Sequence, residues 1–287
     1  MNLSGHTKPF AVLGHPIGHT LSPVMHNASM QALGMDAVYL AFDVEPGKLM
    51  NVLHSMRDMG FGGVNLTVPL KETIIKELPE LDDSARIMGA VNTIEFLKDG
   101  SLKGHNTDGL GFLTAIRETF HTEVAGRSVL ILGSGGAGRA LAITCAKEGA
   151  SDLVVTDLIE ERSLNLAGEI TSLLPDARVK ALPADKQAWK ETCLKSDLII
   201  QATPVGMKPE DEPLLTSGSF RKGHMVYDLI YMFPETSLLS EARRSGARIS
   251  NGLGMLLYQG ARAFTIWTGL QADVAAMRNA LENSIYP

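Results

Sequence analysis

Apolar runs of strand length alternate with longer mixed stretches along the first seventy residues. The apolar runs are 10–14, 37–42 and 62–67. Runs of this length indicate buried strands, and the stretches between them, to about Leu33 and over 46–59, are typical of amphipathic helices. This order predicts a parallel, doubly wound sheet with helices on both faces. Ser22-Pro23 predicts the start of the first helix, with Ser22 as its N-cap, and Gly34 predicts its end.

The pattern then changes to a hairpin and to a second series of strands. Residues 92–97 and the run from Ser101 flank a turn at 98–100, which predicts two antiparallel strands. A helix from Gly109 to about Phe120 follows. Further strands are predicted at 128–132, 152–156, 177–181, 197–202, 225–230 and 247–250.

Two helical stretches close the sequence, at Met255–Thr268 and Ala272–Leu281. No strand is predicted after them, so we expect them to pack on the first domain. The predicted fold class is α/β, with two doubly wound domains, the second of Rossmann type. The first domain spans 1–108 and is completed by helices at 252–287, and the second spans 109–251.

Composition narrows the class of protein. The 287 residues are 45% hydrophobic and 20% charged, as in ordinary globular enzymes, and the length suits two domains. A net charge of -6 without basic runs argues against a nucleic-acid partner. Cys145 and Cys193 lack metal-ligand or disulfide spacing, which predicts reduced thiols and no metal site. The sequence also lacks a signal core and an 18-residue apolar run, so we expect a cytoplasmic protein without a membrane partner.

A glycine motif follows the strand predicted at 128–132. Gly133, Gly135 and Gly138 form G-x-G-x-x-G, and small and apolar residues continue it as a helix. Such glycines allow a tight turn, close approach of a pyrophosphate and close packing of the helix on the strand. The alternative is a glycine-rich turn without a ligand, but the strand and helix around it favour a dinucleotide site. The predicted phosphate loop is Gly133, Ser134, Gly135, Gly136, Ala137 and Gly138.

Asp157 ends the next predicted strand, where dinucleotide folds carry the residue that reads the ribose. A carboxylate there accepts hydrogen bonds from ribose hydroxyls and repels a 2′-phosphate, so it favours NAD over NADP. The alternative is a solvated or capping aspartate. Arg162 is the nearby cation that would weaken this preference.

Three polar clusters are expected at strand ends, where open α/β sheets bind ligands. They contain Thr20 with Ser22, the segment 65–71, and Asn92 with the segment 106–109. Their hydroxyls and amides suit a polyhydroxylated acid. Hydride transfer also needs a group that exchanges the hydroxyl proton, and Lys71 with Asp108 could supply it. Each residue also has a structural explanation, since Lys71 could begin an amphipathic helix and Asp108 could cap the helix at Gly109. Spacing alone therefore does not decide whether the two residues form a catalytic pair.

Five segments together resemble the shikimate dehydrogenase family. They are 15–23 (HPIGHTLSP), 65–71 (NLTVPLK), 89–93 (GAVNT), 106–109 (NTDG) and 251–259 (NGLGMLLYQ). They occur in the family's order and extend over both predicted domains. The resemblance implies reversible NAD- or NADP-linked reduction of 3-dehydroshikimate to shikimate, in the route to chorismate and the aromatic amino acids. It also implies that the first domain binds substrate and the second binds the dinucleotide.

The resemblance implies a role for individual residues. Lys71 would be the acid–base residue and Asp108 its partner. Substrate would be bound by Thr20, Ser22, Thr67, Asn92, Tyr231 and Gln259, with Asn65 beside them bracing the loop. Besides the glycine loop and Asp157, the cofactor would contact Asp83, Thr203, Leu229, Gly252 and Met255.

Two positions depart from the family pattern. Thr20 stands where biosynthetic members usually have serine, and Asp157 lies in the segment where many members have the arginine that binds the NADP 2′-phosphate. Acidic residues there resemble the NAD-using quinate/shikimate branch, which is the second hypothesis. A third is a dinucleotide-binding sensor without catalysis, although the Lys71–Asp108 pair argues against it. We expect the chain to act on a small molecule as a monomer or homodimer.

Overall fold

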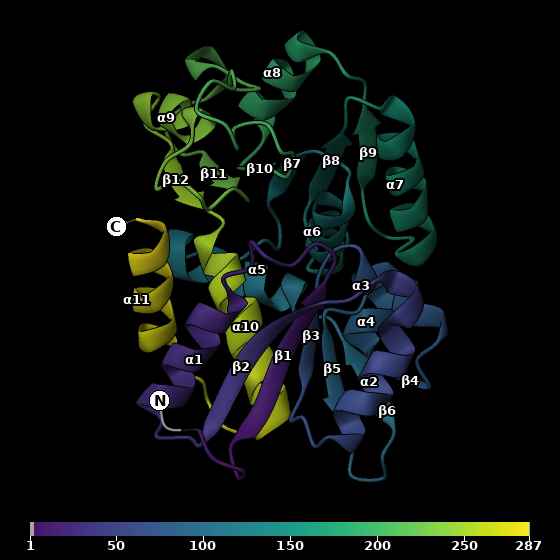
Figure 1. Ribbon diagram of the computed structural model, residues 1–287. Helices are drawn as coiled ribbons and strands as arrows, with labels where there is room; N and C mark the ends of the chain where they lie inside the picture. Colours follow the sequence, from purple (N-terminus) through teal and green to yellow (C-terminus); the bar gives the residue numbers. More distant parts are fainter. Residues whose placement is uncertain (1–2, 287) are drawn as a thin grey trace. The chain divides into compact units, whose positions relative to one another are not determined.

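The computed structural model describes residues 3–286 and divides into two units, each with its own sheet (Figure 1). The described residues up to Gly111, together with those from Leu256 onward, form the first unit, and Phe112–Met255 forms the second. Two helices carry the chain from one unit to the other, α5 (Asp108–Phe120) and α10 (Leu253–Thr268).

The sheet of the first unit is parallel on one side and antiparallel on the other. Its order is β2-β1-β3-β5-β6-β4, in which β2, β1 and β3 are parallel and the β5–β6 hairpin is antiparallel to β3. The strands are β1 (Lys8–Gly14), β2 (Ala37–Asp43), β3 (Val64–Leu66), β4 (Glu80–Leu81), β5 (Thr93–Phe96) and β6 (Leu102–His105). The predicted parallel core and hairpin are confirmed. The two-residue β4, too short to leave a pattern in the sequence, was not predicted.

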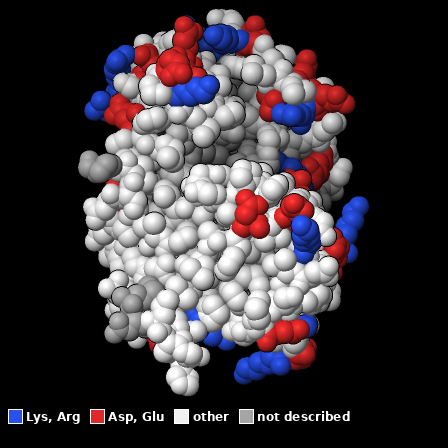
Figure 2. All heavy atoms as spheres, viewed as in Figure 1, with Lys and Arg blue, Asp and Glu red and all other residues white. Residues whose placement is uncertain are grey.

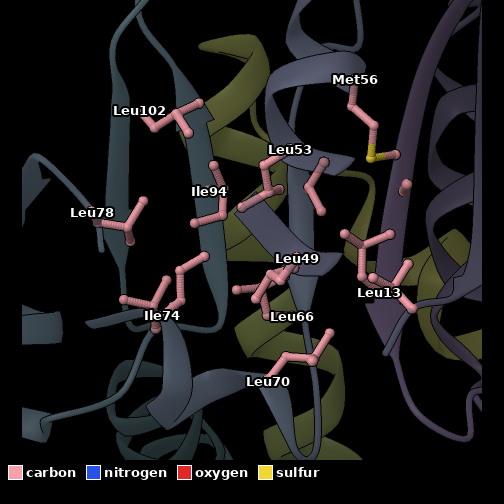
Figure 3. Packing of buried hydrophobic residues seen from close by; sticks show 14 of the residues in the cluster. Leu13, Leu49, Leu53, Met56, Leu66, Leu70, Ile74, Leu78, Ile94 and Leu102 are labelled. Atoms are coloured by element: carbon pink, nitrogen blue, oxygen red, sulfur yellow. The ribbon is translucent and has the colours of Figure 1, made fainter. Parts of the chain in front are cut away.

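Helices cover both faces of this sheet (Figure 1). The helical elements are α1 (Ser22–Ala32), η1 (Pro46–Lys48), α2 (Leu49–Asp58), α3 (Leu70–Thr73), η2 (Ile74–Lys76), α4 (Asp83–Met88), α10 and α11 (Val274–Ile285). Side chains of a strand point alternately to its two faces. Leu13 of β1 therefore points into the core between the sheet and α2, which also contains Leu49 and Leu53 of α2 (Figure 3). Phe10 points to the other face of the sheet and contacts Trp267 of α10. Trp267 also donates to the Ile94 carbonyl at 2.9 Å, so α10 packs on the first sheet as predicted.

The start of α1 differs from the prediction. Ser22 is the first residue of the helix, and Leu21 occupies the N-cap position without a side-chain cap. The Oγ1 atom of Thr20 accepts from the Ser22 amide at 3.3 Å, and it therefore satisfies one of the free amides of the first turn. The predicted end is correct, since Gly34 follows the helix in a left-handed conformation with φ of 64°.

The second unit has a six-stranded parallel sheet in the order β12-β11-β10-β7-β8-β9. Its strands are β7 (Ser128–Leu132), β8 (Asp152–Thr156), β9 (Val179–Leu182), β10 (Leu198–Gln201), β11 (Met225–Asp228) and β12 (Arg248–Asn251). The helical elements are α6 (Gly136–Lys147), α7 (Glu160–Leu173), α8 (Lys186–Lys195), η3 (Ser217–Ser219) and α9 (Ser237–Arg244). This is the Rossmann order. After β7 the chain adds β8 and β9 on one side, and it then returns to place β10, β11 and β12 on the other side of β7.

Each unit contains a buried histidine that is held neutral. Burial lowers the pKa of His26 to about 3 and that of His224 to about 4. An unfolded histidine takes up a proton below a pKa of about 6.5, so acidification stabilises the unfolded chain and the free energy of unfolding falls below that pH. In the second unit Asp228 offsets part of this loss, because burial raises its pKa to about 6. Between that pH and the unfolded pKa of about 3.9, the folded state binds a proton that the unfolded chain does not, and acidification therefore stabilises the folded state.

We therefore predict that the first unit is the more acid-sensitive. Between pH 6.5 and 5, His26 should cost it about 2 kcal/mol of stability, from about 1.4 kcal/mol per pH unit and proton. His26→Phe should remove this loss, since among the described residues neither ring nitrogen has a hydrogen-bond partner and the ring stacks on Tyr39. Urea denaturation at both pH values measures it, with the exposed His54→Gln as control. An unchanged pH dependence in His26→Phe would contradict the prediction.

Candidate active site

Lys71 and Asp108 form an ion pair in the first unit. The Nζ atom of Lys71, near the start of α3, lies 2.7 Å from Oδ2 of Asp108, the first residue of α5. The lysine side chain is 28% exposed and the aspartate side chain 13%, so both groups are partly buried but open to a ligand. Asp108 begins its helix and does not cap it, and its amide donates to the side chain of Asn106 at 3.0 Å.

Asn92 fixes the other oxygen of this carboxylate. Its Nδ2 atom donates to Oδ1 of Asp108 and to Oγ1 of Thr107, each at 2.9 Å, while its Oδ1 atom accepts from the amide of Thr107. Asn92 is 2% exposed, at the residue before β5. Both carboxylate oxygens of Asp108 are thus hydrogen-bonded, which holds its position toward Lys71.

The other predicted substrate residues of the first unit lie in β3 or close to the end of a strand or helix. The hydroxyl of Thr20 donates to that of Ser22 at 3.2 Å, and Thr67 follows β3. Asn65 is a brace, because its amide group donates to the Asn92 carbonyl and to Thr93. These residues belong to the same unit as Lys71 and Asp108.

Gln259 and Tyr231 occupy different units. Gln259 lies on α10 in the first unit. A Cβ atom added to Gly111, one turn after Asp108, would lie 2.7 Å from the backbone nitrogen of Gln259, so the backbones are close at this point. The side-chain amide of Gln259 donates to the Leu256 carbonyl at 2.8 Å. Tyr231 belongs to the second unit, and burial raises the pKa of its hydroxyl.

The glycine loop has the geometry that the motif predicts. Gly133 follows β7 with φ of 103°, and a Cβ there would lie 2.8 Å from the Ala202 carbonyl oxygen. At Gly138, a Cβ would lie 1.9 Å from the Gly133 carbonyl oxygen, so α6 and the strand can pack only around glycine. Gly135 is open, with nothing within 4 Å of a Cβ, and it precedes α6. Free amides at this helix start suit a pyrophosphate.

Asp157 connects β8 to the glycine loop. Its Oδ2 atom accepts from the Ser134 amide at 2.8 Å and its Oδ1 atom accepts from the Ile159 amide at 3.0 Å. The aspartate is therefore a structural brace of the loop, a role that the sequence analysis did not predict. Each carboxylate oxygen retains a further lone pair, which leaves Asp157 able to accept from a ribose hydroxyl.

A pocket of about 350 Å³ extends from this loop within the second unit. Four of the predicted cofactor residues line it, Gly133, Gly135, Asp157 and Thr203. Its other walls are mostly apolar, from Leu132, Thr156, Leu158, Ile159, Arg162, Trp189, Ala202, Pro204, Val205 and Leu214. An apolar pocket beside free helix amides fits an adenosine group with its pyrophosphate. Leu158 and Ile159 were missed, although two consecutive apolar residues directly after a strand-ending aspartate were a usable signal in the sequence.

The remaining predicted cofactor residues lie outside this pocket. Gly252 packs against the Leu229 carbonyl, whose oxygen would lie 2.1 Å from a Cβ atom added to the glycine. The Met255 amide donates to the Tyr227 hydroxyl at 3.1 Å. Asp83 belongs to the first unit and pairs with Arg86 at 2.7 Å.

Asp157→Asn is predicted to shift the cofactor preference toward NADP. The change removes the charge that repels a 2′-phosphate and leaves Arg162 lining the same pocket, while an amide oxygen can still accept from Ser134. The ratio of kcat/KM for NADP to that for NAD should rise about tenfold, a difference of about 1.4 kcal/mol. Asp152→Asn, an exposed residue at the other end of β8, should leave the ratio unchanged. Equal ratios in Asp157→Asn and the unsubstituted chain would refute the prediction.

Metal and membrane sites are absent from the part of the chain that the structure describes. Within residues 3–286, no three His, Cys, Asp or Glu side chains gather as a metal site, and no helix is long and apolar enough to cross a membrane. Where charged side chains occur on the face shown in Figure 2, basic and acidic ones lie next to one another.

Comparisons with known proteins agree with the fold. Residues 12–94 match the shikimate dehydrogenase substrate binding domain, and residues 252–282 match the shikimate 5'-dehydrogenase C-terminal domain. A shikimate dehydrogenase (NADP(+)) of Methanopyrus kandleri is 42% identical over 98% of this chain and 97% of its own length.

Two solved structures extend the comparison. Shikimate 5-dehydrogenase from Listeria monocytogenes, in complex with shikimate and NAD, is 35% identical with a TM-score of 0.91 over 98% of each chain. Quinate dehydrogenase from Corynebacterium glutamicum, in complex with NAD, is 30% identical with a TM-score of 0.89 over 96% of this chain and 99% of its own. On these matches, the chain belongs to the shikimate dehydrogenase family.

Proposed function

We propose that this chain catalyses the reversible NAD- or NADP-dependent reduction of 3-dehydroshikimate to shikimate, on the route to chorismate and the aromatic amino acids. The observation that carries this proposal is the Lys71–Asp108 ion pair, 2.7 Å long, in a chain of the shikimate dehydrogenase family. A protein that only binds dinucleotide would not need such a pair. The first unit would bind the substrate and the second the cofactor. We place the activity in the cytoplasm, in a monomer or homodimer.

Lys71 is proposed to exchange the proton of the reacting hydroxyl. In the reducing direction its ammonium group donates a proton to the carbonyl oxygen, and in the oxidising direction its neutral amine takes the proton back. Asp108, held by Asn92, keeps the Nζ atom in place. The nicotinamide, when bound, supplies or accepts the hydride. Thr20 and Ser22 would hold the carboxylate of the substrate, while Thr67, Asn92, Tyr231 and Gln259 would bind its hydroxyls or help to enclose it.

The cofactor is proposed to bind with its pyrophosphate over Gly135 and its adenosine in the pocket lined by Asp157. The carboxylate supports NAD, and Arg162 in the same pocket leaves room for NADP. The relatives include both cases, since one is named for NADP(+) and two solved structures contain NAD.

Initial rates with shikimate and with quinate, each with NAD and with NADP, test the proposal. We expect the highest kcat/KM with shikimate and NAD. A preference for quinate with NAD would support the second candidate, an oxidative quinate/shikimate dehydrogenase, for which Thr20 and Asp157 are the supporting observations. NADH binding without turnover of 3-dehydroshikimate would indicate a sensor and contradict both.

A further inference from the structure

Tyr39 is a fully buried residue in the middle of β2, and no proposed role includes it. Its hydroxyl donates to Oδ1 of Asn65 at 2.7 Å. Its ring stacks on His26, with ring centroids 4.2 Å apart and planes 8° from parallel.

A chain of hydrogen bonds continues from Asn65 to the proposed acid–base pair. The amide of Asn65 donates to Oγ1 of Thr93 at 3.0 Å, and this hydroxyl donates to Oδ1 of Asn92 at 2.9 Å. Asn92 in turn donates to Asp108, the partner of Lys71. Asn65, Asn92 and Thr93 are buried, so each would be costly to leave unpaired.

We propose that Tyr39 is a positioning residue for substrate binding, which acts by fixing the Asn65 side chain in the orientation that the substrate requires. This inference rests on the proposed function. Packing alone does not explain the tyrosine, because phenylalanine would make the same ring contacts with His26 and with Trp267. The hydroxyl is the part that serves the site, and its partner Asn65 belongs to the predicted substrate pocket.

The test is Tyr39→Phe, which keeps the ring and removes the hydroxyl. The KM for shikimate should rise about tenfold, while kcat and the KM for the dinucleotide stay within twofold, because Lys71, Asp108 and the glycine loop keep their contacts. If Tyr39 acts through Asn65, then Tyr39→Phe added to Asn65→Ala should raise the KM for shikimate less than it does alone. A merely structural role would produce neither the split between KM and kcat nor this coupling.

Phe264→Leu is the matched control. Phe264 is buried and its ring lies 6.4 Å from His26, so the variant loosens the same cluster without touching the hydroxyl. It should lower the melting temperature and leave the KM for shikimate unchanged. An unchanged KM in Tyr39→Phe, or an equal rise in Phe264→Leu, would overturn the inference. An unsubstituted chain inactive on shikimate would instead overturn the proposed function, and with it this inference.

Discussion

Replacing Lys71 with alanine is expected to lower kcat for shikimate oxidation by about 10²- to 10⁴-fold, the range for removal of a general acid–base group. The Nζ atom is the charged donor that Asp108 holds at 2.7 Å, and water would have to exchange the proton without that orientation. The dissociation constant for NADH should not change, because the glycine loop belongs to the second unit. Steady-state rates and energy transfer from tryptophan to bound NADH measure the two quantities.

Lys76→Ala is the control for this prediction. Lys76 is an exposed lysine in η2, five residues further along, and its removal should leave kcat within twofold. Thermal unfolding of both variants separates a catalytic loss from a folding defect. If Lys71→Ala keeps kcat within a few-fold of the unsubstituted chain, the acid–base role of Lys71 is wrong.

Local patterns were sufficient to predict the sheet of the second unit. The apolar run that ends at Gly133 coincides with β7, and the run before Asp157 coincides with β8. Both strands lie inside the sheet and are buried over most of their length, so each contains an unbroken apolar run, 129–132 and 153–155, that is visible in the sequence. β11 ends at Asp228, two residues before its predicted end, because the carboxylate of Asp228 accepts from the Ile230 amide and the Thr236 hydroxyl.

The parts that could not be predicted depend on which polar atoms pair with one another. Ser22-Pro23 has the composition of a helix cap, but the Thr20 hydroxyl accepts from the Ser22 amide and moves the helix start by one residue. The brace from Asp157 to the Ser134 amide joins two strand ends, and the Tyr39–Asn65 hydrogen bond joins β2 to β3. Periodicity reports which face a residue occupies, but it does not report the partner of a buried polar atom.

Gly138→Ala is expected to destabilise the second unit by about 3 kcal/mol or more, at the upper end of the cost of overpacking. The new Cβ would lie 1.9 Å from the Gly133 carbonyl oxygen, which is backbone and cannot rotate away. The strand or α6 must shift, and the loop between them must change with it. Urea denaturation should show the loss without any ligand, and NADH binding should weaken as well.

Gly135→Ala is the matched variant in the same loop, and it should separate folding from binding. Nothing lies within 4 Å of the new Cβ, and the backbone, with φ of −69° and ψ of −176°, is one that alanine adopts. Stability should therefore change by no more than about 1 kcal/mol, the usual range for a helix N-cap. The methyl group would stand where the pyrophosphate approaches, so the KM for the dinucleotide should rise at least tenfold. If Gly135→Ala keeps the dinucleotide KM of the unsubstituted chain, the pyrophosphate does not bind over this loop.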